Sequence, residues 1–179
     1  MADTFLVSAN GIPFTAVNTS HLALFNGAGS GKILRVYRVW VTQSAQDVGI
    51  TGSQQLLGLN RITAATASNW TIAPVAYDST AASIPAQVTS GSKFTVTTSD
   101  LFKRIAWSSD EATLQTGTID EYQLNQGFMY LWDVGYNDAN VEPIVCREGQ
   151  GVSVQNIGYT AVAPANAGYL DVFIEFTMV

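Results

Sequence analysis

Apolar and polar side chains alternate along the C-terminal segment 169–178, and this is the clearest pattern in the sequence. Alternation with a period of two is typical of a β-strand that turns one face toward a core. We therefore predict a strand here, placed inside a sheet, with segment 148–158 as its neighbour. The side chains predicted to face the core are those of Leu170, Val172, Ile174, Phe176 and Met178.

Several other segments carry the short apolar or alternating runs that predict strands. Segment 32–43 is rich in β-branched and aromatic residues and is apolar on both faces, so we predict a central strand there. The strands do not alternate with long helical patterns. We therefore expect an all-β protein, an antiparallel β-sandwich of jelly-roll type. The remaining predicted strands cover residues 21–26, 54–63, 93–98, 127–134 and 141–147.

One segment between the strands has a helical pattern. Ser99 and Asp100 form an N-cap signal, and the apolar residues after them have the spacing of one or two helical turns. At most one short helix is therefore expected. Residues 64–85 and 108–126 are predicted to be mainly loops. The apolar residues of the predicted helix are Leu101, Phe102, Ile105 and Ala106.

The first part of the chain is predicted to be an extended N-terminal arm, residues 1–20, ahead of a single jelly-roll domain, residues 21–179. A short apolar run is followed by a turn signal at Asn10 and Gly11. Exposed apolar clusters tend to mark contact surfaces, so the arm is predicted to dock on a neighbouring subunit. The alternative is that residues 4–7 form the first strand of the sandwich. The predicted assembly interface consists of Phe5, Leu6, Val7, Ile12 and Phe14.

Composition adds one observation, because only 12% of the residues are charged although 47% are hydrophobic. The charged share is about half the usual one. A weakly charged surface is common in β-sandwiches. It also suits a surface that is covered by copies of the same chain or by a partner, and both interpretations stay open.

The charge balance excludes some partners. A net charge of −6 argues against nucleic acid, because phosphate binding needs clustered Lys and Arg. No apolar run approaches the length of a membrane span, and the N-terminus lacks the pattern of a secretory signal. The single cysteine, Cys146, cannot form an internal disulfide. We expect synthesis in the cytoplasm without a signal peptide, and no binding to nucleic acid or membrane.

Two candidate reactive features have simpler interpretations. Residues 27–32, G-A-G-S-G-K, resemble a phosphate-binding loop, but Asn26 replaces the first glycine and Ile33 the hydroxyl residue. A strand rather than a helix is predicted to follow, so we interpret the segment as a turn. His21 and Cys146 would need to be in contact to form a nucleophilic pair. The apolar run around Cys146 is typical of a buried, inert thiol.

Other site chemistries lack a clear pattern. Zinc ligands are missing, and segment 133–138 departs from a calcium loop, which leaves a loose calcium site as a minor alternative. Nothing marks a glycosidase pair among the 14 acidic residues. Phe128, Tyr130 and Trp132 share one predicted strand face and could stack on a sugar, although a core role is commoner. We expect no catalytic residue, no cofactor and no metal site.

Four short motifs lie on predicted strands near the C-terminus. They are L-W-D-V-G-Y at 131–136, E-P-I-V at 142–145, R-E-G-Q-G at 147–151 and D-V-F-I-E-F at 171–176. Together they resemble small jelly-roll structural proteins of tailed-bacteriophage virions, namely capsid decoration (cement) proteins or related head proteins. The similarity is one of overall style over residues 20–179, and it does not extend to the N-terminal arm.

The resemblance implies a virion structural protein rather than an enzyme. Such a protein self-associates, with a trimer favoured, and binds the major capsid protein or another virion protein on the capsid exterior. It is made in the host cytoplasm. The alternative is a carbohydrate- or receptor-binding jelly-roll module of a phage fibre or head, and a hydrolase is the third possibility.

Overall fold

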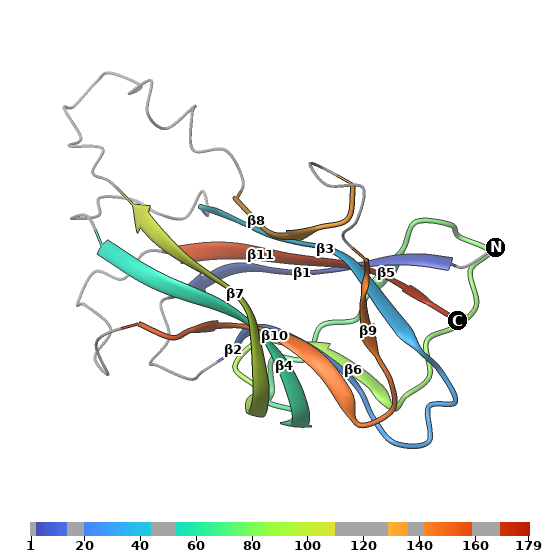
Figure 1. The fold of residues 1–179 in the computed structure, drawn as a ribbon. Coiled ribbons are helices and arrows are strands. Elements are labelled where there is room, and N and C mark those ends of the chain that lie inside the picture. Colours follow the sequence, from blue (N-terminus) through green and yellow to red (C-terminus); the bar gives the residue numbers. More distant parts are fainter. Residues whose placement is uncertain (1–2, 14–19, 44–52, 110–128, 136–141, 159–168) are drawn as a thin grey trace.

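The computed structural model describes residues 3–13, 20–43, 53–109, 129–135, 142–158 and 169–179. In these residues the alternating segments form two antiparallel sheets, packed face to face as two layers (Figure 1), and no helix. These parts of the chain therefore contain no helix that is long and apolar enough to cross a membrane.

The six-stranded sheet has the order β5-β1-β11-β3-β8, and β9 also pairs with β3. Its strands are β1 (Asp3–Pro13), β3 (Leu34–Gln43), β5 (Val75–Ala76), β8 (Met129–Asp133), β9 (Ile144–Cys146) and β11 (Tyr169–Met178). The five-stranded sheet has the order β6-β2-β10-β4-β7. Its strands are β2 (Ser20–Asn26), β4 (Ser53–Thr66), β6 (Val88–Gly91), β7 (Thr95–Ser109) and β10 (Gln150–Asn156).

The strand pairs are nested in the sequence: the first strand pairs with the last, and each further pair lies between the two members of the pair before it. β1 pairs with β11, β2 with β10, β3 with β8 and β9, and β4 with β7. Successive pairs alternate between the two sheets, as a long antiparallel ribbon does when it is rolled up. This is jelly-roll topology, so the predicted fold class is confirmed.

The closing strand β11 shows how the core is built. Its five predicted core residues are all buried, with at most 6% of their surface exposed. Each such side chain contributes roughly 1.5–3 kcal/mol when fully buried. β11 lies inside its sheet, between β1 and β3, as predicted. Segment 148–158, which contains β10, is not its neighbour, however. β10 lies in the five-stranded sheet, between β2 and β4.

The predicted N-terminal arm is wrong for residues 3–13, which form the first strand of the sandwich. Phe5, Val7 and Ile12 are at most 3% exposed, and all three belong to the main core. The ring of Phe5 stacks on that of Phe176 at 5.5 Å. These side chains are therefore covered by their own domain. Leu6 faces outward and is half-buried, and Phe14 lies outside the described residues.

The predicted helix is also wrong, because residues 99–106 belong to strand β7. The register of β7 against β4 shifts at Phe102, which is an extra residue without a direct partner. A bulge of this kind reverses the alternation of faces. Phe102 and Ile105 therefore both pack against the core despite their odd spacing, and this spacing resembled a helix.

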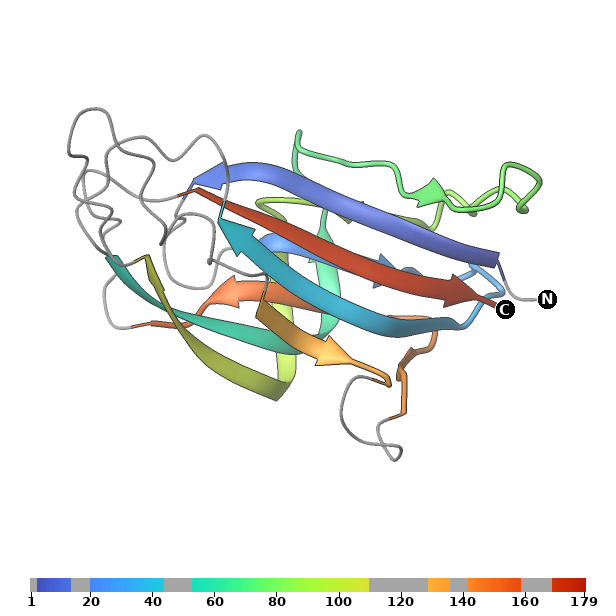
Figure 2. The ribbon, with the colours of Figure 1, turned by 90° about the horizontal axis from the view of Figure 1, so that it is seen from above.

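Residues 71–77, which we call the edge strap, join the edges of the two sheets. At one end, Thr71 bridges Gly91, and the amide of Ile72 donates to the carbonyl of Ser90 at 2.9 Å. At the other end, β5 pairs with Phe5 and Leu6 of β1. Figure 2 shows this segment beside β1, along one side of the sandwich. The edge strap therefore hydrogen-bonds to both layers.

Candidate functional site

The outer face of the six-stranded sheet brings together charged and aromatic side chains. The same alternation that sends the core residues of β11 inward sends Phe173 and Glu175 outward. Strand register then aligns two rows across β11, β3 and β8. The charged row is Glu175, Arg38 and Asp133, and the aromatic row is Phe173, Trp40 and Tyr130.

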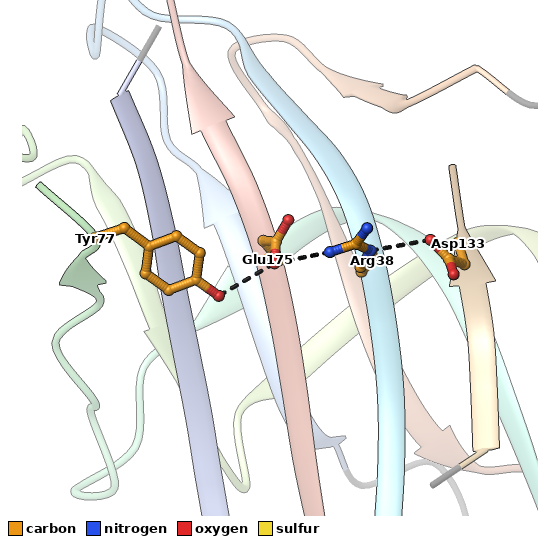
Figure 3. A network of polar contacts seen from close by, with 4 residues as sticks. All are labelled: Arg38, Tyr77, Asp133 and Glu175. Atoms are coloured by element: carbon orange, nitrogen blue, oxygen red, sulfur yellow. Dashed lines mark hydrogen bonds and ion pairs between the residues drawn. The ribbon is translucent and has the colours of Figure 1, made fainter. Parts of the chain in front are cut away.

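Arg38 holds the charged row together (Figure 3). Its Nε donates to Oδ1 of Asp133 at 3.0 Å, and its Nη1 lies 3.6 Å from Oε2 of Glu175. The hydroxyl of Tyr77, which reaches over β1, donates to the same Glu175 oxygen at 3.1 Å. The Arg38 side chain is 46% exposed, whereas those of Asp133 and Glu175 are 8% and 14% exposed. The accessible guanidinium of Arg38 therefore pairs with two carboxylates that are largely covered.

These contacts shift the pKa values of the donors. The hydrogen bond to Asp133 raises the pKa of Arg38, and the charge of Glu175 adds to the effect. Burial raises the pKa of Tyr77, and the carboxylate of Glu175 adds to that effect as well. At neutral pH the guanidinium is thus a cation and the phenol a neutral donor. The charged row keeps its hydrogen bonds under these conditions.

The aromatic row lies beside the charged row. The rings of Trp40 and Phe173 are stacked, with centroids 5.0 Å apart and planes inclined by 6°. The ring of Tyr130 lies 6.3 Å from Trp40 and is tilted by 57°. All three side chains are half-buried. Toward the edge of the same sheet, Val75 and Tyr77 are 67% and 58% exposed.

The outer face is suited to non-covalent contact with another molecule. Trp, Tyr and Arg are enriched at the centres of protein interfaces. The cross-strand pairs hold these side chains in place, which lowers the entropy lost on binding. The carboxylates are already paired with Arg38, so covering the face would not leave them as unpaired buried charges.

Sequence reasoning did not assemble this face. Arg38, Asp133 and Glu175 were each visible as a charge inside a predicted strand, which is the signal that could have marked them. Their proximity depends on which strands are neighbours. That information comes from the nested pairing of the whole chain.

The glycine-rich segment 27–32 is a turn between β2 and β3, as predicted. Gly29 and Gly31 have positive φ angles of 79° and 65°, which glycine adopts without strain. Their amides donate to the carboxylate of Glu148 at 3.1 and 2.7 Å. These two hydrogen bonds lower the pKa of Glu148. The loop thus holds an anionic group supplied by the chain itself.

His21 and Cys146 lie in different sheets, on β2 and β9. Burial raises the pKa of Cys146 to about 12, so its thiol stays protonated at neutral pH. Burial lowers the pKa of His21 to about 4, so its imidazole is neutral. A reactive thiolate needs a lowered pKa, so Cys146 has the character of an inert core residue.

The predicted sugar platform is not formed along β8. Tyr130 lies opposite Trp40 on the outer face, whereas Trp132 lies opposite Val39 and packs against the core. A register shift between these pairs places the two rings on opposite faces. Phe128 lies outside the described residues. So do residues 136–138, the second half of segment 133–138, and within the described residues no cluster of His, Cys, Asp or Glu could hold a metal ion.

Comparison with protein-family models, with curated proteins and with solved structures gives no match for this chain. Function is therefore inferred from the fold and from the outer face.

Proposed function

We propose that this chain is a non-enzymatic structural protein of a tailed-bacteriophage virion, with a decoration or cement role. It self-associates, as a homo-oligomer for which a trimer is favoured, and binds the major capsid protein or another virion protein on the capsid exterior. The outer face of the six-stranded sheet supports this proposal, because its aromatic row and Arg38 consist of residue types that are enriched at interface centres.

The mechanism is passive. A subunit that buries this face across the junction of neighbouring capsid subunits adds interface area to the particle. Every copy in the lattice adds the same contribution, which raises the barrier to rupture. The jelly-roll topology supports this role, since capsid domains commonly use it. Lectin domains use it as well, so the fold alone does not decide between the two functions.

Substitutions at exposed positions on the outer face test the proposal. Val75→Glu and Tyr77→Glu each place a carboxylate on this face while sparing the core, and they should weaken self-association and capsid binding. Leu101→Glu is the matched control, because Leu101 is 50% exposed on the other sheet. Sedimentation velocity, alone and with capsids, gives the readout. Unchanged assembly in both face variants would contradict this assignment, and a wild-type chain that neither self-associates nor sediments with capsids would contradict the function.

The second candidate is a carbohydrate- or receptor-binding module. The aromatic row favours it, since Trp40 and Tyr130 offer partly exposed rings beside the accessible guanidinium of Arg38, which can donate hydrogen bonds to sugar hydroxyls. Titration with a glycan panel, followed by tryptophan fluorescence, distinguishes the two functions. Saturable binding that is lost in Tyr130→Ala supports the second candidate. A flat response across the panel, with assembly intact, supports the first.

A further inference from the structure

The chain contains two Asn-Gly dipeptides in opposite environments. Asn10 and Gly11 lie in a β-bulge of β1, where the register against β11 shifts between Ala9 and Ile12. Asn10 is exposed, and Gly11 has a positive φ of 61°. The amide of Gly11 donates to Oδ1 of Asp171, across the sheet, at 2.6 Å. Solvent therefore reaches the Asn10 side chain.

The second dipeptide, Asn26-Gly27, is held in place by hydrogen bonds. The Asn26 side chain is fully buried, and its amide nitrogen donates to the carbonyls of Lys32 and Cys146 at 2.8 and 3.2 Å. The amide of Gly27 donates to the carbonyl of Gln87 at 2.9 Å. The Asn26 side-chain nitrogen and the Gly27 backbone nitrogen are thus both hydrogen-bonded, and the Asn26 side chain is shielded from solvent, so this dipeptide is an internal control for the first.

We propose that Asn10 is a site of spontaneous deamidation in the folded protein, and that Asp171 restrains the reaction. The backbone nitrogen of Gly11 attacks the side-chain carbonyl carbon of Asn10, forming a new carbon–nitrogen bond. The Gly11 amide proton passes to solvent, the side-chain nitrogen takes up one proton from solvent, and its bond to the carbonyl carbon breaks so that it leaves as ammonia. Water then opens the cyclic imide to give aspartate or isoaspartate. A glycine after the asparagine favours ring closure, because it has no Cβ to obstruct the attack.

Asp171 acts through the Gly11 amide. That nitrogen must turn toward Asn10 before it can react, so its hydrogen bond to the carboxylate has to break first. Hydrogen bonds to charged groups are stronger than those between neutral groups. Asp171 is therefore a positioning residue that keeps the nucleophile directed away from its target.

Deamidation would change the end of the β1–β11 ladder. The product places a carboxylate beside Asp171, and like charges repel. Isoaspartate also lengthens the backbone at the bulge, ahead of the pairs Ile12–Leu170 and Pro13–Tyr169. We expect these last two pairs to loosen, while the ladder from Asp3 to Ala9 remains intact.

Peptide mapping of protein stored in mildly alkaline buffer tests the proposal. The mass gain of deamidation should appear at Asn10 and not at Asn26 in the folded chain, and at both residues in urea. Equal resistance of Asn10 and Asn26 in the folded chain would overturn the proposal.

A variant series tests the restraint. Asp171→Ala should speed conversion of Asn10 about tenfold, the factor expected for loss of a charge-assisted hydrogen bond. Asp171→Asn keeps a neutral acceptor and should have a smaller effect. Phe173→Ala, in the same strand, controls for general loosening and should leave the rate unchanged. An Asp171→Ala rate at or below wild type, or equal acceleration by Phe173→Ala, would refute the role of Asp171.

Discussion

The buried imidazole of His21 predicts a loss of stability in mild acid. Burial lowers its pKa from 6.5 to about 4 in the folded state, whereas the unfolded chain keeps the ordinary value. Between these two values the unfolded state binds more protons, so stability rises with pH across this window. The stability is fully present above pH 6.5 and is lost progressively as the pH falls toward 4.

The difference of about 2.5 pKa units corresponds to about 3 kcal/mol in total, of which about 2 kcal/mol is lost by pH 5. This is a large fraction of the usual 5–15 kcal/mol of domain stability. Urea unfolding, followed by far-UV circular dichroism at a series of pH values, measures it. His21→Gln is the comparison variant, because its side chain does not titrate.

The carboxylates with lowered pKa values act in a different window. The ordinary pKa values of Glu148 and Asp78 are 4.5 and 3.8, and hydrogen bonds lower both pKa values in the folded state. Their contribution is therefore lost only as the pH falls below those ordinary values. Equal slopes for wild type and His21→Gln between pH 6.5 and 5 would refute the argument for His21.

Four further changes to the chain test the fold. Ile174→Asp should prevent folding because it buries an unpaired carboxylate. Glu175→Gln, on the outer face, should lower the free energy of unfolding by about 1 kcal/mol or less. Similar melting temperatures for the two variants would contradict the assigned faces. Deleting residues 1–12 should unfold the domain, because it removes most of β1, and a cooperative thermal transition in the truncated chain would contradict this. Gly151→Ala should destabilise by more than about 2 kcal/mol, since the added Cβ meets the backbone carbonyl of Leu24, and unchanged urea unfolding would show that the sheet relaxes freely.

The sequence predicted those elements whose side chains follow a regular period. β11 was recognisable because its alternation is unbroken, and β3 because both of its faces are apolar. β7 was misassigned, since the bulge at Phe102 interrupts the period of two and sequence patterns contain no direct sign of a bulge. β1 was separated from the domain because the same kind of interruption, at Asn10 and Gly11, looked like a turn.

The outer face could not be predicted for a different reason. Phe173 and Trp40 stack because β11 and β3 are neighbours, and these strands are distant in the sequence. The register of one strand against another follows from the nested order of all the pairs. Single residues could therefore be assigned to an outward position, but their partners could not.

The edge strap has a mechanical consequence. Sliding one sheet over the other loads its two ends in opposite directions. The ladder at β5 and the bonds to Ser90 would then break before the core is fully exposed. A sandwich held only by side-chain contacts would lack this early resistance. The strap therefore acts as a covalently continuous tie between the layers.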